Sequence, residues 1–140
     1  MPQAEAFLDS SYAIALSAPT DQYHQRAVEL AEQIENNAVR LVTTRAVALE
    51  IGNALAKQRH RGAAISLLSA LEADPNIEVV PLSDLLYKQA FELYQQRPDK
   101  EWGMTDCVSF VLMQDRGLTD ALTADDHFRQ AGFRALLRDD

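Results

Sequence analysis

Short apolar segments of strand length alternate with longer segments of helical periodicity along this chain, and that alternation limits the possible folds. Strands are predicted at residues 7–8, 39–42, 77–80 and 120–123, with an edge strand over 133–137. Between them, recurring apolar residues predict helices at 12–16, 21–35, 44–60, 63–71, 82–93 and 105–116, and one helical turn at 126–130. Strands joined by helices pair in parallel, and the helices cover both faces. The sequence therefore predicts one α/β domain over residues 1–140, with a short parallel sheet of four to five strands.

Charge and cysteine content narrow the class of protein. The 140 residues include 13 basic and 21 acidic side chains, a net charge of −8. This argues against a generally basic nucleic-acid-binding surface, although not against a nuclease whose acids hold metal. A single cysteine, Cys107, excludes an internal disulfide and fits a reducing compartment. No segment has the length of a membrane span or the pattern of a signal peptide, so we expect a cytoplasmic protein without membrane association.

Two of the predicted strands are followed by an aspartate. Asp9 comes after the first strand and Asp125 after the fourth. Ligands of parallel α/β folds bind beyond the carboxyl ends of the strands, so both side chains are candidates for a functional site. Aspartate is also common in turns and at helix N-termini, and each residue taken singly fits that simpler explanation.

Glu50 and Asn53 are the polar residues of a segment, 46–56, that is otherwise apolar on nearly every side. Their spacing puts both on one face of the predicted helix, and Lys57 continues that face. The face is either a narrow solvent-exposed stripe or part of a site in which Asn53 supports Glu50. The segment by itself leaves both interpretations open.

Asp106 stands at the start of a strongly apolar predicted helix. It could be a first-turn carboxylate that interacts with the helix dipole, with Thr105 as the cap. A buried carboxylate must otherwise be paired or bind a metal, because an isolated buried charge costs many kcal/mol. Basic partners are scarce in this sequence, since acidic residues outnumber them by 21 to 13.

Four carboxylates from separate segments thus converge on one end of the predicted sheet: Asp9, Glu50, Asp106 and Asp125. Oxygen ligands favour Mg²⁺ or Mn²⁺, and the sequence has no cysteine cluster or paired histidines for zinc. His127 lies two residues after Asp125 and could approach the site. Cys107, on an apolar helix, is expected in the core rather than as a nucleophile.

One basic run, residues 57–61, follows the Glu50 segment and prolongs its predicted helix. Cations are favourable at a helix C-terminus, which would explain the run structurally. Alternatively, Lys57 and Arg61 bind the phosphates of a nucleic-acid substrate. Both interpretations remain open from the sequence.

With these residues in view, the chain resembles the PIN-domain family, and within it the VapC-type toxin ribonucleases. The similarity covers nearly the whole length, and its ordered motifs are Phe7-Leu8-Asp9-Ser10-Ser11, Thr43-Thr44, Leu49-Glu50-Ile51-Gly52-Asn53-Ala54-Leu55, Asp99-Lys100-Glu101-Trp102, Thr105-Asp106-Cys107-Val108-Ser109-Phe110, Leu122-Thr123-Ala124-Asp125-Asp126-His127-Phe128 and Ala131-Gly132-Phe133.

The resemblance implies a Mg²⁺- or Mn²⁺-dependent endoribonuclease that hydrolyses single-stranded RNA with a metal-activated water, as the toxin of a toxin–antitoxin pair. The family's catalytic and metal-binding acids fall on Asp9, Glu50, Asp106 and Asp125, and Ser11 and Thr123 match polar positions beside them. The Thr-x-Asp spacing favours Asp125 over Asp126. Gly103 departs from the family, which often has serine there, and this puts a supporting hydrogen bond in doubt.

The resemblance also implies a homodimer and a small antitoxin that inserts into or covers the acidic cleft. Apolar residues at 12–34 and 63–71 exceed what a small monomer needs and hint at an interface. Two alternatives to the nuclease are a catalytically silent PIN-like binding module and a receiver-like α/β regulator. A receiver would need adjacent acids after the first strand and a late lysine, whereas serines follow Asp9 and no lysine follows Lys100.

Overall fold

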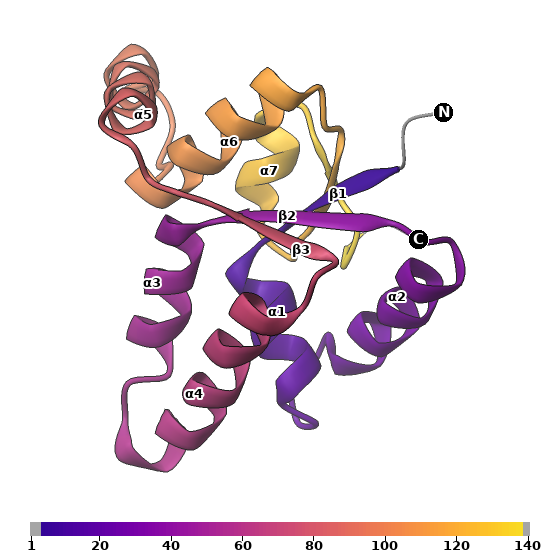
Figure 1. The fold of residues 1–140 in the computed structure, drawn as a ribbon. Helices are drawn as coiled ribbons and strands as arrows, with labels where there is room; N and C mark the ends of the chain where they lie inside the picture. The colour runs from indigo at the N-terminus through magenta and orange to yellow at the C-terminus, as the bar shows by residue number, and fades with distance from the viewer. Residues whose placement is uncertain (1–3, 139–140) are drawn as a thin grey trace.

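The computed structural model describes residues 4–138 and contains a five-stranded parallel sheet (Figure 1). Its strands are β1 (Glu5–Leu8), β2 (Arg40–Thr44), β3 (Ile77–Val80), β4 (Asp120–Leu122) and β5 (Arg134–Ala135). The strand order is β3-β2-β1-β4-β5, and every neighbouring pair is parallel. The predicted α/β architecture is confirmed, although the edge strand is two residues long rather than the predicted 133–137. The chain connects β1 to one side of the sheet and later enters β4 on its other side, so a switch point lies between β1 and β4.

Helices cover both faces of the sheet. They are α1 (Ser10–Ser17), α2 (His24–Asn36), α3 (Arg45–Ala54), α4 (Gln58–Ala73), α5 (Asp84–Gln96), α6 (Met104–Arg116) and α7 (Asp126–Gln130). In Figure 1, α5, α6 and α7 lie above the sheet, and α1, α2 and α4 lie below it. Helix α3 follows β2 and contacts helices of both layers, α1, α4 and α6. It therefore stands beside the carboxyl ends of the strands.

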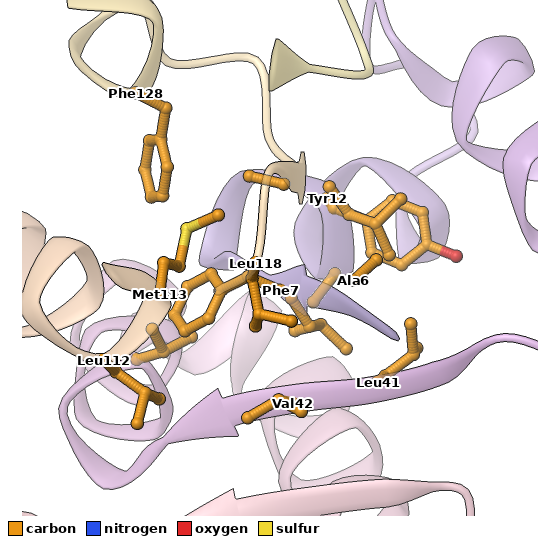
Figure 2. Close-up of a cluster of buried hydrophobic side chains, with 14 of the residues drawn as sticks. Ala6, Phe7, Tyr12, Leu41, Val42, Leu112, Met113, Leu118 and Phe128 are labelled. Carbon is orange, nitrogen blue, oxygen red and sulfur yellow. The ribbon is translucent and has the colours of Figure 1, made fainter. Parts of the chain in front are cut away.

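The core fixes the helices that carry the candidate site. Phe7 of β1 is fully buried among side chains that include Met113 of α6 and Phe128 of α7 (Figure 2). Phe110 of α6 packs edge-on against Phe128, with 5.0 Å between the ring centroids. Trp102 also packs edge-on against Phe110, at the same spacing. Such aromatic pairs contribute about 0.5–1.5 kcal/mol each beyond their buried area, so they hold the start of α6 beside α7.

The predicted boundary between the third and fourth helices is wrong. A helix over 44–60 with a break at 61–62 was expected, whereas α3 ends at Ala54 and α4 begins at Gln58. Gly62 lies inside α4, where glycine costs only about 1 kcal/mol relative to alanine. The turn at 55–57 returns α4 along α3 and delivers the chain to β3, beside β2. Packing, rather than helix propensity, places this turn, because 54–56 are good helix formers.

Two smaller features of the helices also bear on the site. Thr44 caps α3, since its Oγ1 accepts a hydrogen bond from the Val47 backbone N–H at 3.2 Å. Helix α6 begins at Met104 with Gly103 as its cap, so the expected Thr105 cap is wrong. The helix therefore begins one residue earlier than predicted, with the Asp106 carboxylate accepting the backbone N–H of Gly103.

Within residues 4–138, no helix has the length and apolar character needed to cross a membrane.

Candidate active site

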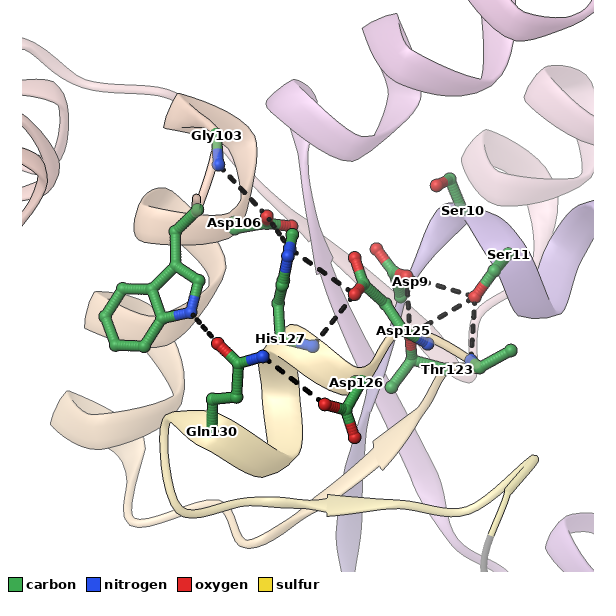
Figure 3. Close-up of polar contacts among 12 residues, drawn as sticks. Asp9, Ser10, Ser11, Gly103, Asp106, Thr123, Asp125, Asp126, His127 and Gln130 are labelled. Carbon is green, nitrogen blue, oxygen red and sulfur yellow. Dashed lines mark hydrogen bonds and ion pairs between the residues drawn. The ribbon is translucent and has the colours of Figure 1, made fainter. Parts of the chain in front are cut away.

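Asp9 lies at the switch point, directly after β1. Its side chain is 5% exposed and accepts hydrogen bonds from Thr123 Oγ1 at 2.7 Å and Ser11 Oγ at 3.1 Å (Figure 3). Thr123 follows β4, and the parallel pairing of β1 with β4 brings the two positions together. The backbone N–H of Asp9 also donates to the Leu122 carbonyl, at 3.2 Å. The sheet therefore fixes Asp9 in place from both strands.

Ser11 and Thr123 extend this network to the start of α7. Their hydroxyl oxygens are 3.2 Å apart, and the Asp125 backbone N–H donates to Thr123 Oγ1 at 3.0 Å. Ser11 Oγ accepts the backbone N–H of Ala124, also at 3.0 Å. The two hydroxyls thus tie Asp9 to the backbone of the segment that carries Asp125.

Asp106 and Asp125 meet through His127. His127 Nδ1 lies 3.0 Å from Asp106 Oδ2 and 3.4 Å from Asp125 Oδ1 (Figure 3). Asp125 is the N-cap of α7, and its Oδ1 accepts the backbone N–H of His127 at 2.9 Å. Asp106 Oδ2 also accepts the backbone N–H of Gly103 at 3.1 Å. The donor atoms of these two carboxylates and the imidazole lie within 4.8 Å of one another.

Glu50 approaches the same place from α3. Its Oε1 accepts a hydrogen bond from the hydroxyl of Ser10, the first residue of α1. The charges of Asp106 and Asp125 act on Glu50, and the charge of Glu50 acts on Asp9. Four carboxylates from four separate segments therefore interact electrostatically as one group. We call this group the acidic centre; its members are Asp9, Glu50, Asp106 and Asp125.

The acidic centre is short of positive charge. Burial raises the pKa of Asp9 from 3.8 to about 6, and the charge of Glu50 adds to this increase against the opposing hydrogen bond from Thr123. Burial likewise raises the pKa values of Glu50 and Asp106. Within residues 4–138, no lysine or arginine forms a salt bridge with any of the four carboxylates. A bound cation would favour the ionised form of such buried acids, as a proton favours their neutral form.

The PIN domain family model matches residues 6–134. The chain belongs to the PIN domain family. Two solved structures share the fold of this PIN domain over nearly its whole length. VapC20 of Mycobacterium tuberculosis, a Sarcin-Ricin loop cleaving toxin, is 25% identical with a TM-score of 0.83, covering 92% of this chain and 96% of that chain. VapBC2 of Rickettsia felis, bound to a DNA fragment from their promoter, is 13% identical with a TM-score of 0.68.

The VapBC2 match covers 91% of this PIN domain and 93% of that chain, and at this identity it bears on the fold alone. No curated protein matches the sequence. Membership of the PIN domain family excludes the receiver-like alternative. The strand order agrees, because doubly wound receivers have the order 2-1-3-4-5 whereas this sheet has the order 3-2-1-4-5.

The remaining predicted site residues of the PIN domain, Asn53, Lys57 and Arg61, are exposed on α3, in the turn that follows it and in the first turn of α4. Asn53 is exposed and lines a cavity of about 310 Å³ together with Glu50 and Thr105. Lys57 and Arg61 are exposed at the turn between α3 and α4, where Arg61 Nη2 donates to the Ala56 carbonyl at 2.8 Å.

Asp125 and Asp126 occupy different surroundings, which separates two neighbours that the sequence could not. Asp125 faces Asp106 and His127, whereas Asp126 accepts a hydrogen bond from Gln130 at 3.3 Å and lies 3.8 Å from Arg129 (Figure 3). Asp126 is thus engaged along the outside of α7.

Sequence reasoning missed Ser10 and gave His127 only a possible role. Ser10 and Ser11 are adjacent, and as the first residues of α1 their side chains diverge, so one reaches Glu50 and the other Asp9. A serine pair directly after a strand-terminal aspartate was the available signal. His127 is the third donor of the tightest group, and its spacing of two from Asp125 follows from the capping turn of α7.

The residues present fit a divalent cation. Carboxylate oxygens from separate elements face one another. Among residues 4–138, the backbone, hydroxyl and imidazole contacts that hold them leave other carboxylate oxygens without a hydrogen bond, Asp106 Oδ1 among them. A hard cation with oxygen ligands at about 2.1–2.5 Å suits such a set. Cys107 is no alternative nucleophile, because burial raises the pKa of its thiol to about 11.

Proposed function

We propose that this PIN domain is a divalent-cation-dependent endoribonuclease that hydrolyses single-stranded segments of RNA. The observation that carries the proposal is the acidic centre, which gathers four carboxylates at the switch point of the sheet without a lysine or arginine salt-bridge partner among residues 4–138. A cluster of this kind destabilises the fold unless a cation joins it, so selection for stability does not explain it. Similarity to VapC20, an RNA-loop-cleaving toxin, supports the choice of RNA.

Asp9, Asp106 and Asp125 are the residues that would hold Mg²⁺ or Mn²⁺. When bound, such a cation activates water and neutralises charge on the scissile phosphate. Thr123 and Ser11 fix the orientation of the Asp9 carboxylate through hydrogen bonds of 2.7 and 3.1 Å. Because these bonds exist before RNA arrives, little reorganisation is needed during the reaction.

Glu50 is assigned to orienting the attacking water, or to ligating the cation. Burial and the charges of Asp106 and Asp125 raise its pKa, which brings the carboxyl closer to the range of a general base. The Ser10 hydroxyl holds one of its oxygens and leaves the other for water. Asn53 shares the adjoining cavity and is placed to support the substrate beside Glu50.

Lys57 and Arg61 are assigned to the RNA phosphates. The sequence offered a simpler explanation, namely cations at the C-terminus of the α3 helix, but the run begins α4 instead. Cations in the first turn oppose the helix dipole, so helix stability does not account for the run. An exposed basic turn supplies phosphate contacts that a chain of net charge −8 otherwise lacks.

We further propose that the protein is the toxin of a cytoplasmic toxin–antitoxin pair and forms a homodimer. The predicted apolar surplus at 12–34 and 63–71 includes only Val28 and Ile65 among the exposed large apolar residues. More of these residues lie on and before α5: Leu82, Leu85, Tyr87, Phe91 and Tyr94. A second copy that covers α5 would remove several of these exposed side chains from water.

Residues of the apolar surplus do line a groove of about 590 Å³ between α1, α2 and α4. Leu16, Ile34 and Leu67 form part of its wall, and Glu35 and Asp74 stand among the lining residues. This composition suits an antitoxin segment with apolar side chains flanked by basic ones.

The experiment is a cleavage assay on a pool of structured RNAs with Mg²⁺, Mn²⁺ or EDTA. We expect cleavage with either cation and none with EDTA. In Asp106→Asn, the cleavage rate should fall by about 100-fold or more. Glu72→Gln, in an exposed salt bridge with Arg45, is the matched control and should cleave at the wild-type rate. RNA binding without cleavage would identify a silent PIN module, and full activity of Asp106→Asn would overturn the site assignment.

A further inference from the structure

The imidazole of His127 lies beside two carboxylates of the acidic centre, and the proposed reaction gives it no role. Its Nδ1 lies 3.0 Å from Asp106 Oδ2 and 3.4 Å from Asp125 Oδ1. Two neighbouring ligands of an octahedral ion, each bonded at about 2.1–2.2 Å, are about 3 Å apart. The nitrogen therefore lies from each carboxylate oxygen at about the spacing of adjacent ligands on one cation, and the ligand atoms of the three residues lie within 4.8 Å of one another.

The backbone fixes this arrangement. Asp125 and His127 belong to one capping turn, in which the His127 N–H donates to Asp125 Oδ1 at 2.9 Å. Asp106 is held from the opposite side by the Gly103 N–H. The side chains of Asp106, His127 and Asp125 are 15%, 30% and 35% exposed, so one side of the group is open to water and substrate.

We infer that His127 ligates the cation through Nδ1, together with Asp106 and Asp125, and that this nitrogen makes the site prefer Mn²⁺ over Mg²⁺. The inference rests on the proposed cation-dependent function and specifies the cation. Mg²⁺ is a hard ion that takes oxygen ligands, whereas imidazole is a ligand of divalent transition metals. Mn²⁺ combines acceptance of nitrogen with the carboxylate-rich surroundings found here.

A different role for the same contact is a hydrogen bond from His127 that orients Asp106. In that case the imidazole acts on the carboxylate and not on the ion, so its loss would weaken binding of Mg²⁺ and Mn²⁺ equally. Ligation through nitrogen instead predicts a loss that falls mainly on Mn²⁺. The ratio of the two dissociation constants therefore separates the two roles.

The test compares the wild type, His127→Asn and the control His60→Asn, which alters an exposed histidine of α4. Asparagine keeps a polar atom near the position of Nδ1 but offers oxygen in place of the ring nitrogen. We expect Mn²⁺ affinity to fall about 10-fold or more in His127→Asn, with Mg²⁺ affinity changed much less. His60→Asn should match the wild type for both ions. An equal loss for both ions would overturn nitrogen ligation.

Pulsed electron paramagnetic resonance of the one-to-one Mn²⁺ complex gives a readout independent of activity. Modulation from a coordinated ¹⁴N is expected in the wild type and His60→Asn, and its absence in His127→Asn. Replacing histidine ¹⁴N with ¹⁵N in the wild type should change the modulation, which tests the inference even if the variant does not fold. Mn²⁺ bound without nitrogen modulation would refute the inference and leave the nuclease proposal intact. Failure of the wild type to bind either ion would refute both.

Discussion

Carboxylates at the acidic centre and carboxylates on the surface of this PIN domain are the same chemical groups in opposite electrostatic conditions. At the acidic centre, burial raises the pKa values of Asp9, Glu50 and Asp106. Elsewhere, hydrogen bonds from arginine lower the pKa values of three surface acids, Glu72, Glu78 and Asp99. Their partners are Arg45, Arg116 and Arg97.

The difference shows how a chain with few cations uses them. Arginines stand beside acids that are already in water, where such pairs contribute about 0–1 kcal/mol. The buried acids, for which a partner would matter most, form no salt bridge with lysine or arginine within residues 4–138. The ionised carboxylates of the acidic centre thus lower the stability of the fold, and a bound metal ion would offset this cost.

The largest expected effect is on stability, from Asp9→Asn in the presence of EDTA. Because the folded-state pKa of Asp9 is raised from 3.8 to about 6, its favourable contribution is present below pH 4 and lost as the pH rises through 6. A shift of about two units corresponds to about 3 kcal/mol. Asp9→Asn should therefore be more stable than the wild type at pH 7.5 by up to about that amount, with no advantage at pH 4.

Urea unfolding at pH 4, 6 and 7.5 measures this difference. A variant less stable than the wild type at pH 7.5 would show that Asp9 is not destabilised by its burial, and would remove the contrast between the two groups of acids.

Cation binding should produce the next largest effect. A cation that binds the folded site and not the unfolded chain stabilises by about 2.7 kcal/mol at a hundred times its dissociation constant. For a domain of this size, the melting temperature should rise by about 5–10 °C. Asp106→Asn should raise the melting temperature without metal and reduce the shift with it, because one of the mutually repelling charges is removed.

Thermal melts in Mg²⁺ or Mn²⁺ are compared with Na⁺ at matched ionic strength, with Glu72→Gln as the control. Equal melting temperatures at saturating divalent cation would mean that the acidic centre binds no ion.

A third test asks whether the exposed basic residues Lys57 and Arg61 contribute to RNA binding. Replacing Lys57 and Arg61 with alanine should weaken RNA binding and reduce its salt dependence, by about one in the log–log slope for each lost phosphate contact. The cation-induced melting shift should persist, since both residues lie at the α3–α4 turn. Affinity measured between 50 and about 200 mM salt gives the slope, and an unchanged slope would return the basic turn to a purely structural role.

The smallest effect is expected at the paired surface acids. Glu72 has a lowered pKa, so its contribution is present at neutral pH and lost as the pH falls through its folded value, the reverse of Asp9. Glu72→Gln should slightly lower the melting temperature at pH 7 and have no effect at acidic pH. High salt should abolish the difference because the pair with Arg45 is exposed. A gain in stability at pH 7 would contradict the comparison.

Much of the site could be placed from the sequence because it depends on strand ends. Asp9 and Asp125 follow predicted strands, and parallel strands bring their carboxyl ends to one edge of the sheet. The residues that lie on helices were harder to place. Glu50 was ambiguous between a solvent stripe and a site, since periodicity gives the face of a helix but not what covers that face.

Apolar periodicity was enough to predict the α/β alternation and the parallel pairing, and the charge count was enough to predict an excess of acids over basic partners. Three features of the site instead depend on tertiary packing: Asp125 and not Asp126 faces Asp106, Ser10 contacts Glu50, and the turn at 55–57 puts the basic run at the start of α4. The two groups of features differ in the sequence separation over which their interactions act. Local propensity acts over one helical turn, whereas the packing of α6 on α7 and of α4 on α3 joins residues tens of positions apart.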